Sequence, residues 1–187
     1  IIGSNADEAT LFMPLIHLSD AVEYERIMRA TFGAHTDDVL KIYPVAASGN
    51  VRAALARVIT ETGFVCPALD LAEAAAGTHV AYTYHFTRHR AGLIGKRLGA
   101  FHGIEVMYLF WGMPFKPSED DQHVIHVMRA AWGGFAHTGV PVADPPWPAY
   151  TRNTQAIYRI DVQPRVVTDV TEGRCARLHV ALGGATP

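Results

Sequence analysis

The sequence is poor in charge and concentrates neither sign in one segment. Its 187 residues include 16 Lys and Arg against 18 Asp and Glu, and only 18% of residues are charged. The lack of a basic stripe argues against a nucleic-acid partner, and an apolar content of 49% argues against a disordered tail. No apolar run approaches the ~18–20 residues of a membrane span. We therefore expect one soluble globular domain with a substantial core.

Cysteine is scarce, because Cys66 and Cys175 are the only two in the chain. Their number fits one disulfide in an exported protein, or two buried free thiols in a cytoplasmic one. Histidine is common, with ten residues, but no third ligand stands at an obvious metal-binding spacing from its closely spaced pairs. We expect neither a metal nor a cofactor.

Capping residues and hydrophobic periodicity predict an alternation of helices with a few strands. Helices are expected from Asp20 to Gly33, Thr36 to Tyr43, Asn50 to Gly63, Pro67 to Gly77, and Ser118 through Phe135. Strands are expected at Ile1–Ile2, His79–Phe86, Ala156–Val162 and Arg165–Val170. This alternation indicates the α/β class, although at most four strands make a thin sheet. No methionine precedes Ile1, so we expect the protein's own N-terminus to lie elsewhere.

Two short segments carry groups suited to acid–base chemistry. Asp7 and Glu8 directly follow the first predicted strand, at the end where α/β sheets place their ligands. His102 follows the next strand across a loop and lies among Gly99, Ala100 and Gly103. A hydrolase triad of the order serine, acid, histidine would end in this way. The alternatives are a solvated acidic turn and a glycine-rich loop that happens to contain a histidine.

Five segments in the same order resemble the type-B carboxylesterases, the cholinesterase-like esterases. GSNADEATLF resembles the segment with their catalytic glutamate, and LGAFHGIEVMYLFWG is similar to the segment with their catalytic histidine. FVCPALDLA, HVAYTYHF, and MRAAWGGFAHTGVP with WPAY are similar to three further segments of the family. The resemblance covers essentially the whole chain. It implies the C-terminal part of an α/β-hydrolase fold, comprising the last sheet strands and their flanking helices.

The resemblance also implies roles for individual residues. Glu8 would be the triad acid and His102 the triad base, while Glu105 would support the histidine from behind. The small residues around His102 would let its loop present the imidazole to a serine. Cys66 and Cys175 would form a disulfide if the protein is exported, whereas free thiols would suit a bacterial cytoplasmic esterase. The location remains open between these two.

The departures from the family pattern matter more for activity than the matches. The nucleophile should sit in Gly-x-Ser-x-Gly, but none of the four serines has glycine both two residues before and two after it. The glycine-rich oxyanion loop is missing as well. In smaller departures, Ala9 replaces a usual glycine and Glu61 a usual aspartate. The chain therefore resembles only the C-terminal portion of a larger enzyme.

We expect residues 1–187 to form the C-terminal portion of a serine carboxylesterase and to be inactive alone. The expected partners are the N-terminal portion of the same enzyme and a small-molecule ester. Without that portion, an exposed apolar face would favour a self-dimer. The alternative is a catalytically silent, cholinesterase-like binding or adhesion domain.

Overall fold

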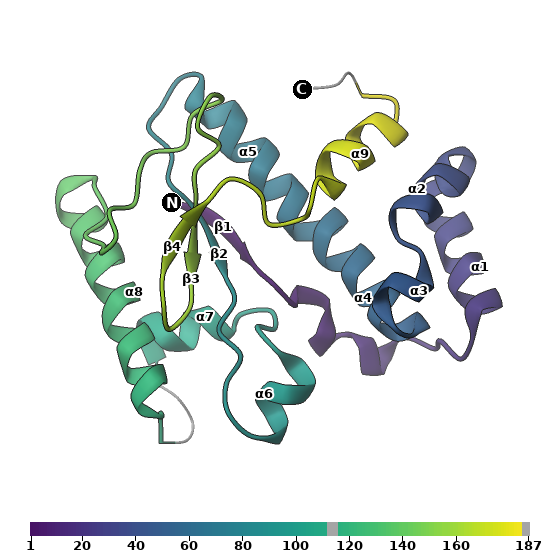
Figure 1. Ribbon diagram of the computed structural model, residues 1–187, viewed down its shortest axis with the longest axis horizontal. Coiled ribbons are helices and arrows are strands. Elements are labelled where there is room, and N and C mark those ends of the chain that lie inside the picture. The colour runs from purple at the N-terminus through teal and green to yellow at the C-terminus, as the bar shows by residue number, and fades with distance from the viewer. Residues whose placement is uncertain (112–115, 185–187) are drawn as a thin grey trace.

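The computed structural model describes residues 1–111 and 116–184 and is shown as a ribbon in Figure 1. Gly112, the last residue of the histidine segment, lies outside the described residues. A mixed sheet has the order β1-β2-β3-β4, with strands Ile2–Asn5, Thr83–Phe86, Ile157–Ile160 and Arg165–Val167. β1, β2 and β3 run parallel, and β4 pairs antiparallel with β3. The expected α/β class is confirmed.

Helices cover both faces of this sheet. α8 lies on one side and α5 with α4 on the other, and α1, α2 and α3 form a group beyond α4 (Figure 1). The α-helices are α1 Ala21–Phe32, α2 Thr36–Ile42, α3 Val45–Ser48, α4 Val51–Thr60, α5 Cys66–Ala76, α6 Leu93–Leu98, α7 Ile104–Val106, α8 Glu119–Thr138 and α9 Arg174–Ala181. Short 3-10 turns are η1 Glu8–Leu11, η2 Met13–Leu15 and η3 Gly33–His35, and π turns are η4 Glu61–Val65 and η5 Met107–Trp111.

The predicted capping residues begin three of these helices. The side chains of Asp20, Asn50 and Ser118 accept hydrogen bonds from backbone N–H groups in the first turns of α1, α4 and α8. Each cap satisfies an amide that has no partner inside the helix. Gly33 ends α1, as its position predicts.

The predicted end of a helix at Gly63 is wrong. The chain passes from α4 through the π turn η4 directly into α5, so the two form one long helical rod. Pro67 explains the π turn, because a proline has no N–H to donate and its ring clashes with the carbonyl four residues earlier. The wider turn removes that clash and lets the helix continue through Gly63.

The strand predictions are correct in place but not in length. β1 extends beyond Ile2 to Asn5, while β2 occupies only the second half of His79–Phe86. Ahead of β2, Ala81 makes an isolated bridge to Tyr150. Helix α9 has no counterpart in the predictions. It begins after Gly173 without a side-chain cap, so the usual start signal is absent from the sequence.

Two apolar clusters form the main core. One joins α1, α2 and α4 around Met28, Val39 and Leu55. The other lies between the sheet and α8, around Phe86, Tyr158 and Met128. Stacking of Trp147 on Tyr158, with ring centroids 4.8 Å apart, ties the proline-rich segment to the sheet. The second cluster therefore supports the strands whose carboxyl ends carry the candidate site.

A buried histidine on β2 predicts a loss of stability in acid. Burial lowers the pKa of His85 to about 4, and the charge of Arg159 adds to this effect. In the unfolded chain the imidazole of His85 titrates with its ordinary pKa of 6.5, whereas in the folded state burial disfavours the protonated form. The neutral imidazole therefore makes its full contribution to the free energy of unfolding above pH 6.5. About 3 kcal/mol of that free energy is lost as the pH falls toward 4.

Urea unfolding between pH 7 and pH 4 would measure this loss. The variant His85→Asn should show a flatter dependence of unfolding free energy on pH, because an amide does not titrate. The variant His79→Asn, at an exposed histidine, should keep the original slope. Equal slopes in the two variants would contradict the assignment of the effect to His85.

Candidate active site

Glu8 lies just beyond the carboxyl end of β1, at the first residue of η1. The residue is 4% exposed. One carboxylate oxygen, Oε1, accepts the backbone N–H of Asn5 at 2.7 Å. Burial raises the pKa of Glu8 above its ordinary value, while the Asn5 amide and His102 partly offset that rise. The carboxylate is therefore held in a fixed direction by its own chain segment.

The other carboxylate oxygen of Glu8 faces the imidazole of His102. Its Nδ1 lies 2.7 Å from Oε2 of Glu8, across 94 residues of sequence. Gly103 follows with a φ of 77°, a left-handed conformation that favours glycine, and turns the chain into α7. The structure thus brings together the two residues that the sequence identified as acid and base.

The imidazole stands at the surface between two aromatic rings. Its side chain is 49% exposed, in contrast to the buried carboxylate behind it. The rings of Phe12 and Phe64 have their centroids 5.6 Å and 5.2 Å from that of the imidazole. These contacts limit the directions that the ring can adopt. An incoming molecule can reach the imidazole while Glu8 remains shielded from water.

This arrangement can perform general acid–base chemistry. A carboxylate at Nδ1 fixes the tautomer that carries its proton there and stabilises the imidazolium once it forms. Nε2 is then the nitrogen that accepts a proton from a reacting group. None of the four serines, all within the described chain, is hydrogen-bonded to His102; Ser4, for example, contacts His85 at 3.3 Å.

Asn5 links the acid segment to the histidine segment, and sequence reasoning missed it. Its side-chain Nδ2 donates to the carbonyl of Phe101 at 3.0 Å and to the carboxylate of Glu105. Its Oδ1 is buried without a hydrogen-bond partner in the described part of the chain. The available signal was a polar residue at a strand end, three positions before the candidate acid.

Glu105 lies behind the histidine loop rather than against the imidazole. Its carboxylate is joined to Asn5, and within the described chain no hydrogen bond connects it directly to His102. The same Asn5 also donates its backbone N–H to Glu8. Within the described chain Glu105 is thus linked to the pair by hydrogen bonds through Asn5, and its negative charge also helps to raise the pKa of Glu8.

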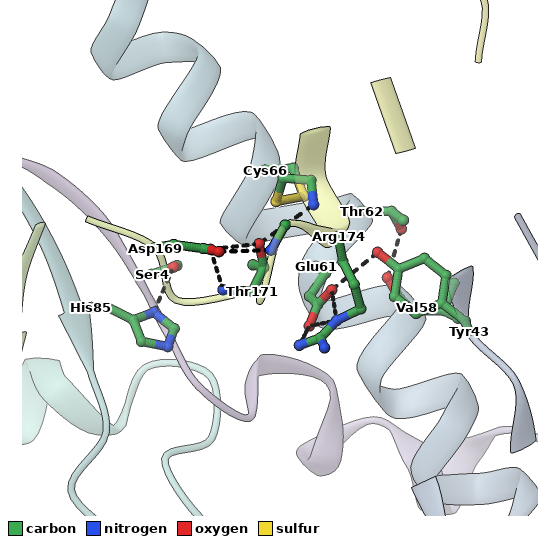
Figure 2. Close-up of a disulfide and its surroundings, with 12 residues drawn as sticks. Ser4, Tyr43, Val58, Glu61, Thr62, Cys66, His85, Asp169, Thr171 and Arg174 are labelled. Carbon is green, nitrogen blue, oxygen red and sulfur yellow. Dashed lines mark hydrogen bonds and ion pairs between the residues drawn. A yellow bond between two sulfur atoms is a disulfide. The ribbon is translucent and has the colours of Figure 1, made fainter. Parts of the chain in front are cut away.

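Cys66 and Cys175 are joined in a disulfide that attaches α9 to the start of α5 (Figure 2). A buried ion pair lies beside it. Arg174 approaches the carboxylate of Glu61 through two nitrogens, each at 2.8 Å, and Tyr43 donates its hydroxyl to the same carboxylate at 3.1 Å. Glu61, one of the departures from the family pattern, thus retains a carboxylate at a structural ion pair and leaves the Glu8–His102 contact intact.

Searches for two other kinds of site gave negative results over residues 1–111 and 116–184. No group of three or more His, Cys, Asp or Glu side chains is placed to hold a metal ion. No helix in the same ranges combines the length and apolar character needed to cross a membrane.

Comparison with known proteins gives a consistent set of relatives. The model of the Carboxylesterase family matches residues 2–178. The chain is 36% identical over 104 residues to an acetylcholinesterase of Leptinotarsa decemlineata, covering 51% of this chain and 16% of that protein. It is 29% identical over 167 residues to a fumonisin B1 esterase of Sphingopyxis macrogoltabida, covering 81% and 30%. It is 27% identical over 192 residues to the pyrethroid hydrolase Ces2e of Rattus norvegicus, covering 89% and 33%.

A solved structure supports the fold. A thermophilic PNB esterase superposes with a TM-score of 0.76 at 20% identity, over 94% of this chain and 37% of its own. The likeness confirms the α/β-hydrolase fold expected from the sequence. The chain spans about a third or less of the length of the curated relatives it matches.

Proposed function

This chain belongs to the carboxylesterase family, and we propose that it supplies the glutamate and the histidine of a Ser-His-Glu triad that hydrolyses carboxylic esters. The observation that carries the proposal is the 2.7 Å contact between Glu8 Oε2 and His102 Nδ1, with the imidazole half-exposed and the carboxylate buried. A silent binding or adhesion domain has no chemical need for this contact, so the geometry favours the esterase.

In the proposed reaction His102 accepts a proton and gives it up again in each of two steps, acylation and deacylation. Nε2 takes the proton of a serine hydroxyl as the serine oxygen attacks the ester carbonyl. The imidazolium, stabilised by Glu8, then gives that proton to the oxygen of the departing alcohol. The acyl group remains bound to the serine as an acyl-serine. Water repeats the sequence on the acyl-serine, releasing the carboxylic acid and restoring the serine. The chain itself would supply His102 as the base and Glu8 as the carboxylate that fixes its tautomer and stabilises the imidazolium.

We further propose that residues 1–187 are the C-terminal portion of one esterase domain. The nucleophile and the oxyanion donors would come from the N-terminal portion of the same enzyme. Two observations support this: the small share of each relative that the chain covers, and the pairing of β1, among the described strands, with β2 alone. The outer edge of β1 is thus available to a further strand. Self-dimerisation in the absence of that portion stays a prediction.

Labelling with a fluorophosphonate, followed by denaturing mass spectrometry, tests the esterase proposal. The reagent forms a covalent bond with the activated serine of a serine hydrolase. We expect the label on a serine outside these 187 residues, and none on Ser4, Ser19, Ser48 or Ser118. The variant His102→Gln should label far more slowly, because the serine loses its base. A protein extended to the length of its relatives that resists the label would contradict the proposal.

A further inference from the structure

We propose that Asp7 is a positioning residue for His102, acting through the backbone of the loop that carries the imidazole. The inference rests on the proposed esterase function and adds a residue to it. Asp7 precedes Glu8 directly, yet its side chain points to different partners. The two neighbouring carboxylates would then serve one base: Glu8 would hold the imidazole, and Asp7 would hold the chain on which the imidazole is mounted.

Asp7 forms two hydrogen bonds with Ala100, the residue two positions before His102, and acts as donor in one and acceptor in the other. Its backbone N–H donates to the carbonyl of Ala100 at 3.1 Å, and its Oδ2 accepts the N–H of Ala100 at 2.9 Å. Ala100 itself is fully buried. These two bonds fix both polar groups of one loop residue, so the peptide planes leading to His102 have little freedom to rotate.

Neighbouring contacts extend the same attachment along the loop. Thr10 donates its hydroxyl to the carbonyl of Leu98 at 2.5 Å, and Asn5 binds the carbonyl of Phe101. The segment from Asn5 to Thr10 therefore holds the loop on both sides of Ala100. Asp7 contributes the central pair of bonds.

The carboxylate of Asp7 is itself oriented by the loop after β2. Nε2 of His89 lies 2.7 Å from Oδ2, the same oxygen that accepts the Ala100 amide. The side chains of His89 and Asp7 are 57% and 30% exposed. Such a solvent-exposed pair adds little to folding stability. Loss of Asp7 should therefore act on the loop mainly by leaving the buried N–H of Ala100 without its acceptor, so unfolding is recorded for each variant beside its activity.

Gly99 shows how closely Asp7 approaches the loop. A Cβ added to this residue would overlap Oδ2 of Asp7, and its φ of +62° disfavours other residues as well. The glycine before Ala100 is thus required for the carboxylate to reach the amide. This gives one of the small residues ahead of His102 a specific physical purpose.

Asp7 also borders a cavity separate from the Glu8–His102 pair. It lines an open cavity of about 520 Å³ with Ala6, Thr87, Arg88, His89, Arg159 and Asp161, and neither Glu8 nor His102 lines that cavity. The proposed role of Asp7 therefore runs through the backbone of the loop, by its two bonds to Ala100. Since displacements near 1 Å at a reacting group can slow a reaction about 100-fold, a residue that positions the loop influences the rate.

The test compares Asp7→Ala and Asp7→Asn in the esterase complete with its nucleophile portion. Hydrolysis of a p-nitrophenyl ester gives kcat and KM, and proton NMR at low field follows the Nδ1–H of His102 in its bond to Glu8. Asp7→Ala should lower kcat about 10- to 100-fold with KM within about 2-fold of the wild type, and should weaken or broaden the low-field signal. Asp7→Asn keeps an oxygen for the Ala100 amide, so most of kcat should return.

Asp38→Ala serves as the matched control, because Asp38 is an exposed aspartate in a surface ion pair with Lys41 on α2. It should leave kcat and the low-field signal unchanged. A wild-type kcat and signal in Asp7→Ala would overturn the positioning role, as would equal losses in Asp7→Ala and Asp7→Asn. Failure of the proposed function looks different: the wild type itself would hydrolyse no ester and bind no fluorophosphonate.

Discussion

Replacing Glu8 with glutamine should lower kcat for ester hydrolysis by about 10⁴-fold, the loss typical of removing the charge from a triad acid while keeping its shape. The amide oxygen of the introduced glutamine can still accept the Asn5 N–H that Glu8 accepts at 2.7 Å. The NH2 group of that side chain then faces Nδ1 of His102 and donates to it, which forces the imidazole proton onto Nε2. In that tautomer the nitrogen facing the serine can no longer accept a proton.

The measurement is steady-state hydrolysis by the complete esterase, with thermal unfolding recorded for each variant. KM should change little, since Glu8 is buried behind the imidazole and out of reach of the ester. Glu25→Gln, in an exposed ion pair on α1, is the matched control and should keep full activity. A folded Glu8→Gln variant with kcat within about 10-fold of the wild type would remove Glu8 from the triad.

Loss of the Cys66–Cys175 disulfide should lower the free energy of unfolding by about 4 kcal/mol at 25 °C. The bond joins residues 109 positions apart, and a loop of that length restricts the unfolded chain strongly in the loop-entropy description. Urea unfolding of the oxidised protein and of the Cys66→Ala, Cys175→Ala and double variants gives the numbers. Each single variant should lose nearly as much as the double variant, because either change breaks the same link.

Helix α9 should nevertheless stay docked in the double variant. Arg174 and Glu61 remain paired, and their side chains are only 13% and 7% exposed (Figure 2). Amide hydrogen exchange in α9 should therefore rise only modestly when the disulfide is absent and much more when Arg174→Ala is added, since that change leaves a buried carboxylate unpaired. If the loss in Cys66→Ala greatly exceeds that in Cys175→Ala, packing rather than the covalent link is responsible.

Local signals in the sequence identified most elements and the central residues of the site. The caps at Asp20, Asn50 and Ser118 act within three residues, so they are legible without a fold. The segments around Glu8 and His102 were recognisable by their resemblance to one family. Where a signal was local but ambiguous, as at Gly63 before Pro67, the prediction failed because a glycine ahead of a proline is typical of a helix end, whereas here a π turn accommodates the proline and the helix continues.

The α/β class, the capped helix starts, and the choice of Glu8 and His102 as the proposed acid and base could all be predicted from the amino-acid sequence. The contacts of those residues could not be predicted, because they depend on how distant segments come together in the fold. Parallel pairing of β1 with β2 brings the carboxyl ends of two distant strands to one edge, and this joins Glu8 to His102 across 94 residues. The partners of Asn5 and Asp7 arise in the same way. Contacts between loops that far apart leave no periodicity in the sequence, because they depend on strand order and packing rather than on neighbouring residues.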